Sequence, residues 1–328
     1  ARPASKFDYN HNSAMMDYQD VLTKECLLIP GEPLLIAVSG GPDSIFLWEI
    51  LKSLNFPIII AHFNHQLRPD SAQEQGILAE MASRQGFQFI GGHRNIAHLA
   101  KEKHFSIEEA ARKARYQFLF EQARQYQAQA VVTGHSADDQ VETVMMHILR
   151  GSGLSGIRGM SFRSLPNSWS DTIPLVRPLL STWRREIQAY LSLKNLTVLE
   201  DESNQDTRFF RNRVRHDLIP RLENINPGFR KRLWQMANLV GDDLEIVNCL
   251  VDEAWERCIC NENPSWLTFN LPALKSQPRA IQRYILRQAL VHLNPVSLEI
   301  NSDTIERGVN FICKPGRSRL SDWTAGFR

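Results

Sequence analysis

A short segment, SGGPDS at residues 39–44, follows an apolar run and precedes an amphipathic one. Where a strand turns into a helix, several backbone N–H groups have no partner and the positive end of the helix dipole lies behind them. Two glycines let a phosphate approach that backbone, and the serines add hydroxyl donors. The missing Gly-Lys-Ser/Thr ending argues against a Walker-type loop, and Asp43 suits a Mg²⁺ ion beside a polyphosphate. A plain turn with Asp43 as helix N-cap would explain the same residues.

A second acidic group follows the apolar run at residues 128–135. That run predicts a strand, so Asp138 and Asp139 fall in the first turn of the next helix. Asp139 and Glu142, three residues apart, share one face of that helix. Two carboxylates at a strand end suit Mg²⁺ or a cationic amine. Compensation of the helix dipole is the alternative, and it accounts for one aspartate more readily than for the pair.

Two further patterns have competing explanations. GSGLSG at residues 151–156 fits the GxGxxG spacing, but it follows a helical pattern ending at Arg150 instead of a strand, which excludes NAD or FAD binding by that route. Arg112 and Arg115, three residues apart, share a helix face that could equally be a solvated surface supported by Glu108.

A basic segment lies further along the chain. Residues 205–235 contain eight basic and three acidic side chains, a local net charge of +5, with Phe209, Phe210 and Trp234 among them. Basic residues interleaved with aromatic rings suit a nucleic-acid backbone and its stacked bases. Charge runs are usually only solvated faces, so this interpretation needs support from elsewhere in the chain.

The scaffold for these residues is indicated by the alternation of short apolar and longer amphipathic runs between residues 33 and 134. The alternation predicts a doubly wound, mainly parallel α/β sheet, whose ligands bind at the carboxyl ends of the strands. Long helical patterns dominate from about residue 220 and predict a smaller helical domain. The predicted strands are residues 34–39, 56–64, 87–92 and 128–135.

Length and composition narrow the class of protein. A chain of 328 residues predicts two domains, and 43% hydrophobic with 23% charged residues excludes a mostly disordered chain. Five cysteines without a CxxC pair indicate a reduced intracellular protein. The sequence has no apolar run of transmembrane length and no secretory signal, so we expect a cytoplasmic protein without a membrane partner.

The motifs together resemble a known family. SGGPDS is similar to the signature SGGxDS of the PP-loop enzymes, or N-type ATP pyrophosphatases, which split ATP into AMP and pyrophosphate while adenylating a substrate. TGHSADDQVETVMMHILRGSGLSGIRGM at 133–160 resembles the second signature of the tRNA(Ile)-lysidine synthetase family. Three further blocks resemble that family in the same order: HFNHQLRPDS at 62–71, SIEEAARKARYQFL at 106–119 and EDESNQDTRFFRNRVRHDLIP from residue 200.

The resemblance covers about residues 33–220 and implies an adenine nucleotide alpha hydrolase-like fold. It implies an N-terminal extension (1–30), a PP-loop catalytic domain (31–215) and a mainly helical tRNA-binding domain (216–328). Beyond residue 220 the similarity weakens, and we expect a short form without the second C-terminal domain of longer members. A homodimer is left open.

The activity implied by the resemblance uses ATP and Mg²⁺ to join free L-lysine to carbon 2 of the wobble cytidine in the CAU anticodon of an isoleucine tRNA. The cytidine is first adenylated with release of pyrophosphate. The lysine amine then expels AMP, assisted by a carboxylate that positions it and accepts a proton. The product, lysidine, changes codon reading from AUG to AUA.

The residues and the resemblance together define a candidate site. His62 and His65 lack a third metal ligand, so we expect that loop to pack on the adenine base. The expected catalytic residues are Asp43, Arg115, Asp139 and Glu142, with Mg²⁺ on Asp43 and Asp139 as a further metal ligand. The expected ATP contacts are Ser39, Gly40, Gly41, Pro42, Asp43, Ser44, Ala61 and His62. The expected tRNA or lysine contacts are Arg112, His135, Asp138, Arg150, Gly151, Gly153, Arg211, Asn212 and Arg215.

Three alternatives stay open at this point. A tRNA thiolase would need catalytic or cluster-binding cysteines, which the absence of CxxC disfavours. A PP-loop amide-forming ligase such as NAD synthetase would have no use for the basic segment at 205–235. A non-catalytic, ATP-dependent RNA-binding protein would leave Asp139 and Glu142 without a role, and pyrophosphate release would distinguish it from the enzymes.

Overall fold

The computed structural model describes residues 18–67, 71–199, 209–293 and 302–313. The chain divides into two compact units, Ala1–Asn238 and Leu239–Arg328. The division falls within helix α11 (Phe229–Cys258), whereas the sequence places a functional boundary between residues 215 and 216. The functional domain boundaries stay predictions.

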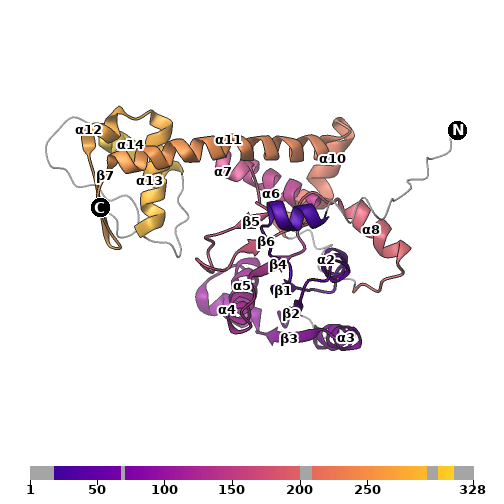
Figure 1. The fold of residues 1–328 in the computed structure, drawn as a ribbon. Coiled ribbons are helices and arrows are strands. Elements are labelled where there is room, and N and C mark those ends of the chain that lie inside the picture. Colours follow the sequence, from indigo (N-terminus) through magenta and orange to yellow (C-terminus); the bar gives the residue numbers. More distant parts are fainter. Residues whose placement is uncertain (1–17, 68–70, 200–208, 294–301, 314–328) are drawn as a thin grey trace. The chain divides into compact units, whose positions relative to one another are not determined.

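A six-stranded sheet lies within the first unit, in the order β3-β2-β1-β4-β6-β5 (Figure 1). All neighbouring strands are parallel except β5, which pairs antiparallel with β6. The predicted doubly wound, mainly parallel α/β fold is therefore confirmed, and the four predicted strands correspond to β1–β4. The strands are β1 (Leu34–Ala37), β2 (Ile58–Asn64), β3 (Gln88–His93), β4 (Ala130–Thr133), β5 (Arg163–Ser164) and β6 (Leu175–Val176).

The strand order contains a topological switch point between β1 and β4. The chain builds β2 and β3 on one side of β1 and then returns to add β4 on the other, so that Leu35 pairs with Ile59 on one side and with Val131 on the other. Open α/β sheets bind ligands outside the carboxyl ends of the strands at such a point. Both acidic candidate segments directly follow these two strands.

Helices connect the strands and account for the rest of the first unit. The short helices α4 and α7 and the two-residue strands β5 and β6 were not predicted, since each is too short to show a period in the sequence. The helices are α2 (Pro42–Ser53), α3 (Ser71–Arg84), α4 (Ile96–Lys103), α5 (Ile107–Gln125), α6 (Ala137–Leu149), α7 (Leu154–Ile157), α8 (Arg184–Leu193), α9 (Phe210–Arg213) and α10 (Ile219–Ile225), with π-helical turns η1 (Val21–Glu25) and η3 (Val214–Leu218).

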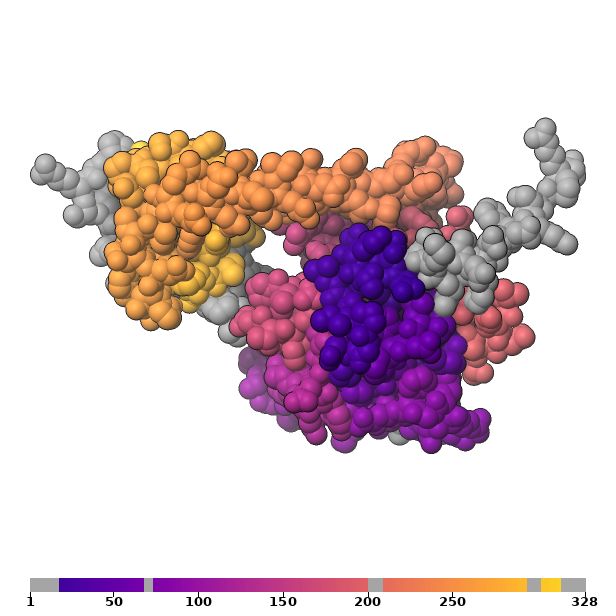
Figure 2. Space-filling view, viewed as in Figure 1, coloured from indigo at the N-terminus to yellow at the C-terminus, as the bar shows by residue number. Residues whose placement is uncertain are grey.

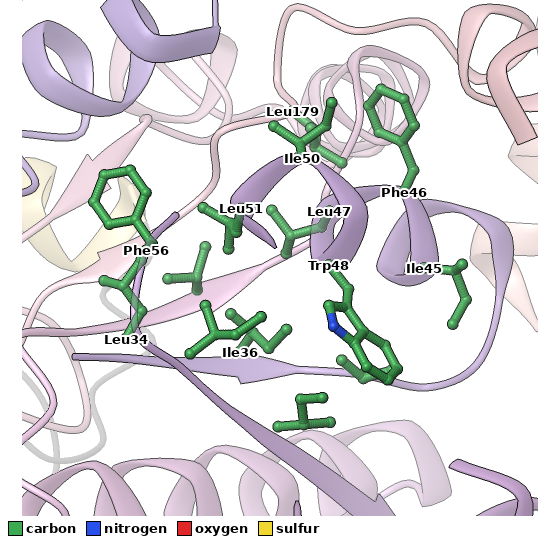
Figure 3. Close-up of a cluster of buried hydrophobic side chains, with 14 of the residues drawn as sticks. Leu34, Ile36, Ile45, Phe46, Leu47, Trp48, Ile50, Leu51, Phe56 and Leu179 are labelled. Atoms are coloured by element: carbon green, nitrogen blue, oxygen red, sulfur yellow. The ribbon is translucent and has the colours of Figure 1, made fainter. Parts of the chain in front are cut away.

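Helix α2 fixes the direction of the loop that precedes it. Gly41 is its N-cap and Pro42 its first residue, a position where the missing N–H of proline costs nothing. Leu47 and Leu51 are fully buried and lie on the side of α2 that faces Ile36 of β1 (Figure 3). Each such leucine stabilises the fold by roughly 1.5–3 kcal/mol, so the helix holds the loop against the end of the sheet.

The N-terminal segment of the described chain belongs to the same core. Leu22, Cys26 and Leu28 are buried in the cluster that contains β1 and α2. The hydroxyls of Tyr18 and Thr182 lie 2.7 Å apart, which ties this segment to the loop before α8. Its surface is the indigo patch in Figure 2. Residues 18–28 thus contribute buried side chains to the core of the first unit.

The second unit has its own hydrophobic core, in which Ile285 and Val309 are fully buried. Its helical character is confirmed, but the hairpin of β7 and β8 was not predicted. No helix within the described ranges combines the length and apolar character that crossing a bilayer would require. The elements beyond α11 are β7 (Ile259–Asn263), β8 (Trp266–Phe269), α12 (Leu271–Ser276), α13 (Arg279–Leu293) and α14 (Ser302–Cys313).

Candidate active site at the switch point

The loop between β1 and α2 is closed by one of its own side chains. The hydroxyl of Ser44 accepts hydrogen bonds from the N–H groups of Ser39 and Gly40, each at 3.2 Å, and donates to the carbonyl of Gly41 at 2.9 Å. The expectation that the backbone N–H groups of this corner have no partner is therefore wrong for Ser39 and Gly40. Gly40 has φ of 90°, and a Cβ there would lie 2.6 Å from Leu199.

Asp43 follows this loop in the first turn of α2. Its Oδ1 is buried without a hydrogen-bond partner among the described residues, and its Oδ2 lies 3.5 Å from Nη2 of Arg184. Burial raises the pKa of Asp43 to about 6, against the opposing charge of Arg184. Because Gly41 is the N-cap, the alternative role of Asp43 as N-cap is excluded.

The buried oxygen of Asp43 fits a cation. An unsatisfied buried acceptor needs a partner, and a carboxylate oxygen beside a phosphate loop suits Mg²⁺. Within residues 18–67, 71–199, 209–293 and 302–313, no group of three or more His, Cys, Asp or Glu side chains has the arrangement of a metal site. A Mg²⁺ ion here would therefore take further ligands from phosphate and water, as is usual for this ion.

Asp139 has two structural partners at once. Its Oδ2 accepts from the N–H and the hydroxyl of Ser136, both at 3.0 Å, which forms a capping box at the start of α6. Its Oδ1 accepts from Nη2 of Arg211 at 2.9 Å and of Arg215 at 3.1 Å. Burial opposes ionisation, but the charges of Arg211 and Arg184 outweigh it and hold the pKa of Asp139 below its usual range.

Glu142 lies beside Asp139 and is almost completely buried, at 1% exposure. Arg215 donates from Nε to Oε1 at 2.6 Å, and Arg211 donates from Nε to Oε2 at 2.9 Å. The predicted pair of carboxylates on one helix face is thus present, and both members are neutralised by arginines. Arg211 and Arg215, which the sequence predicts to contact tRNA or lysine, come from α9 and η3; Asn212 lies between them.

Two arginines that the sequence did not single out as site residues complete the cluster. Nη2 of Arg184 lies 3.5 Å from Oδ1 of Asp139, and Nη1 of Arg184 lies 3.7 Å from Oε1 of Glu142. Asp138 accepts from the backbone N–H of Arg184 at 2.8 Å and from Nη1 of Arg230 at 2.6 Å. These contacts join residues about 45 to 90 positions apart, so no local spacing could indicate them.

The same contacts modify the interpretation of the basic segment. Arg211, Arg215 and Arg230 make ion pairs with the acidic cluster, so part of the local charge of +5 is neutralised within the protein. Arg208 lies outside the described residues. Contact between the remaining basic side chains and RNA stays a prediction.

The two histidines of the candidate site each have a hydrogen-bond partner at Nδ1. Nδ1 of His62 lies 2.9 Å from the carbonyl of Val38, so this nitrogen must carry the proton that it donates. Burial lowers the pKa of His62 despite that bond. Nδ1 of His135 lies 2.8 Å from the hydroxyl of Thr133, and burial lowers the pKa of His135 against the charge of Asp139. Ala61 is buried within β2, next to His62.

Arg112 and Arg115 lie on α5, outside the ion pairs of the acidic cluster. Their guanidinium carbons are 5.0 and 5.1 Å from the ring centroid of Tyr116, which is fully buried and stacks on Trp169. Nε of Arg115 is buried without a hydrogen-bond partner among the described residues. The predicted catalytic role of Arg115 is not tested by this arrangement.

The glycine-rich segment begins at the far end of α6. Arg150 is the C-cap of this helix, about 16 Å along the axis from Asp139 at about 1.5 Å per residue. Gly151 and Gly153 follow, and both have open space where a Cβ would lie. The structure therefore does not bring Arg150, Gly151 and Gly153 to the acidic cluster, and their contact with tRNA stays a prediction.

Gly134 was not predicted as a site residue, because it acts only through its lack of a side chain. A Cβ on Gly134, directly after β4, would lie 2.9 Å from the carbonyl oxygen of Asp43. Only glycine lets the end of β4 approach the first turn of α2 this closely. The sequence signal is the glycine of TGH between the strand and the helix, whose lack of a side chain indicates no chemistry.

Comparison with known proteins agrees with this geometry. Residues 13–222 match the PP-loop domain, the class of protein that the sheet and its loop define. The chain is 36% identical over 265 residues to the tRNA(Ile)-lysidine synthase of Geobacter sulfurreducens, which covers 80% of this chain and 55% of that protein. It is 32% identical over 309 residues to the tRNA(Ile)-lysidine synthase of a Nostoc species, which covers 89% of this chain and 87% of that protein. The chain belongs to the tRNA(Ile)-lysidine synthase family.

Two further findings qualify the comparison. The chain spans 55%, 64% and 59% of the lengths of three of the curated relatives that it matches. Among solved structures, the U34-tRNA thiolase from Methanococcus maripaludis matches with a TM-score of 0.57 at 15% identity, covering 71% of this chain and 81% of that chain. At that identity the likeness shows the fold alone.

Proposed function

We propose that this protein uses ATP to join lysine to carbon 2 of the wobble cytidine in the CAU anticodon of an isoleucine tRNA. The observation that supports this most directly is that the phosphate loop and the Asp139–Glu142 pair meet at one switch point in a member of this family. The PP-loop family implies use of ATP. The product would be lysidine, formed with release of AMP and pyrophosphate.

In the first step the loop at residues 39–44 holds the phosphates of ATP. The unpartnered Oδ1 of Asp43 is the atom that would hold Mg²⁺, whose charge would help to neutralise the phosphates. The O2 atom of the cytidine attacks the α-phosphorus, and pyrophosphate leaves. His62, neutral and fixed by its bond to Val38, stands beside the loop as a surface for the adenine base.

In the second step the ε-amine of lysine attacks carbon 2 of the cytidine, and AMP leaves. Asp139 and Glu142 are the carboxylates that would hold the amine and accept its proton. Both are bonded to Arg211 and Arg215 in this structure, so a lysine ammonium has to replace a guanidinium to reach them. Both side chains carry one positive charge, and the exchange leaves the charge of the cluster unchanged.

The test is transfer of labelled lysine to a CAU-anticodon isoleucine tRNA transcript in the presence of ATP and Mg²⁺. The control transcript has the wobble cytidine replaced by uridine. We expect incorporation with the first transcript and none with the second. Equal incorporation into both, or none into either, would contradict the proposed function.

A further inference from the structure

Arg184 forms ion pairs with both halves of the candidate site, and no other described side chain does so. Its Nη2 lies 3.5 Å from Oδ2 of Asp43, beside the phosphate loop, and 3.5 Å from Oδ1 of Asp139. Its Nη1 lies 3.7 Å from Oε1 of Glu142. The guanidinium therefore stands where the ATP half of the site meets the half that would receive the second substrate.

The contacts of Arg184 are weaker than those of its neighbours. Arg211 and Arg215 reach the acidic pair at 2.6–3.1 Å, within the normal range of a hydrogen bond. The contacts of Arg184, at 3.5–3.7 Å, lie beyond that range, and its side chain is 26% exposed. A guanidinium has five N–H donors, so Arg184 has donors to offer an incoming anion.

The backbone of Arg184 is fixed independently of its side chain. Arg184 is the first residue of α8, and its N–H donates to Oδ2 of Asp138 at 2.8 Å. The N–H of Trp183 donates to Oε2 of Glu186 at 2.9 Å, which caps the helix. Substitution of the Arg184 side chain leaves both bonds in place.

We propose that Arg184 binds the α-phosphate of ATP and stabilises the charge that develops there during adenylyl transfer, an inference that rests on the proposed function. The α-phosphorus is the atom of ATP that the cytidine attacks, so the two substrates meet there. The cytidine O2 atom forms a bond to the α-phosphorus while the bond between the α-phosphorus and the bridging oxygen breaks. The electron pair of the broken bond leaves with pyrophosphate. Negative charge grows on the nonbridging oxygens, and a planar guanidinium can donate to two of them at once.

A purely structural role is the competing explanation. Asp43, Asp138, Asp139 and Glu142 bring four negative charges together, and Arg184 supplies the fourth positive charge beside Arg211, Arg215 and Arg230. That role needs only a positive charge, so lysine would serve it. Binding of two phosphate oxygens needs the fork of arginine, which lysine lacks. The Arg184→Lys variant therefore separates the two roles.

The experiment measures pyrophosphate release by the 328-residue chain with ATP, Mg²⁺ and the CAU transcript in the absence of lysine. For Arg184→Gln we expect the single-turnover rate constant of pyrophosphate release to fall about 100-fold, the usual cost of one charge-stabilising donor. The dissociation constant for ATP should rise by a smaller factor, because the contact with the α-phosphate strengthens in the transition state. Arg184→Lys should keep the thermal stability of the unaltered protein but lose at least about tenfold in that rate constant.

Arg185 provides the matched control, since it is the next residue of the same helix turn and is exposed. Arg185→Gln should leave pyrophosphate release unchanged. Added guanidinium should restore part of the pyrophosphate release of Arg184→Ala. Full activity of Arg184→Gln or of Arg184→Lys would overturn the assignment of Arg184. No pyrophosphate release by the unaltered protein would instead contradict the proposed function itself.

Discussion

Charge in the candidate site is balanced residue by residue. Glu142, at 1% exposure, is paired with both Arg211 and Arg215, and removing those partners would leave a buried carboxyl group uncompensated. Asp43 is the exception, because its one ion pair is long and burial raises its pKa to about 6. The residue with the least satisfied carboxylate is thus the one next to the phosphate loop, where a cationic ligand would complete it.

His135 carries a prediction about pH. Burial lowers its pKa in the folded protein, so the unfolded chain takes up a proton at pH values where the folded protein does not. Above the unfolded pKa of about 6.5, His135 has no effect on the free energy of unfolding, because it is neutral in both states. As pH falls below that value, His135 lowers the free energy of unfolding by up to about 1.4 kcal/mol per pH unit. We expect His135→Gln to lose less stability than the unaltered protein between pH 7 and pH 4.5.

Chemical denaturation at several pH values measures this difference. His98→Gln, at an exposed position of α4, is the control for replacing a histidine by glutamine. Parallel pH profiles for His135→Gln and the unaltered protein would show that His135 does not contribute.

The elements position the site by close approach of two strand ends. The loop after β1 and the start of α6 after β4 come together because Gly134 leaves room for the carbonyl of Asp43. Leu199, whose N–H donates to the carbonyl of Gly40 at 2.9 Å, covers the loop from the other side. The close approach of the two strand ends therefore adds to the bonds of Ser44 in setting the geometry of the loop at residues 39–44.

Gly134→Ala tests this dependence. The added Cβ would lie 2.9 Å from Asp43 O, so the backbone of the first turn of α2 must shift. We expect the dissociation constant for ATP, measured by calorimetry, to rise at least about tenfold, which corresponds to about 1.4 kcal/mol. Gly76→Ala on α3 is the matched control, because a Cβ there meets nothing within 4 Å. Unchanged ATP affinity in Gly134→Ala would show that the loop does not depend on the close approach of the two strand ends.

Sequence patterns predicted the elements better than their contacts. The strands β1–β4 were predictable because each lies in a short, mainly apolar run bounded by turns. The Asp139–Glu142 spacing defines a helix face without tertiary information. Arg184 and Arg230 were not predictable as site residues, since they reach the carboxylates only through the folded chain. The closure of the loop by Ser44 was also missed, because the motif shows which donors exist and not where they point.

At the scale of the whole molecule, each described hydrophobic cluster falls entirely within one of the two units. Ile36 belongs to the core around β1 and α2, and Ile285 to the core of the second unit. Both side chains are completely buried. Units with separate cores can unfold in separate transitions.

We therefore expect two transitions in differential scanning calorimetry and a selective effect of core substitutions. Ile285→Ala should lower the free energy of unfolding of the second unit by about 2–5 kcal/mol, the usual cost of a buried Ile-to-Ala change. The transition of the first unit should stay in place. Ile36→Ala should instead shift the transition of the first unit. A single transition that both variants shift equally would mean that the two units unfold together.

The bond between Ser44 and its own loop has a consequence for how a nucleotide arrives. If the loop binds phosphate as we propose, a phosphate oxygen would replace the Ser44 hydroxyl as the acceptor for the N–H groups of Ser39 and Gly40. Rotation of the Ser44 side chain, which also donates to the carbonyl of Gly41, would release those two donors. Because the loop is already folded without a nucleotide, binding would then cost little backbone conformational entropy.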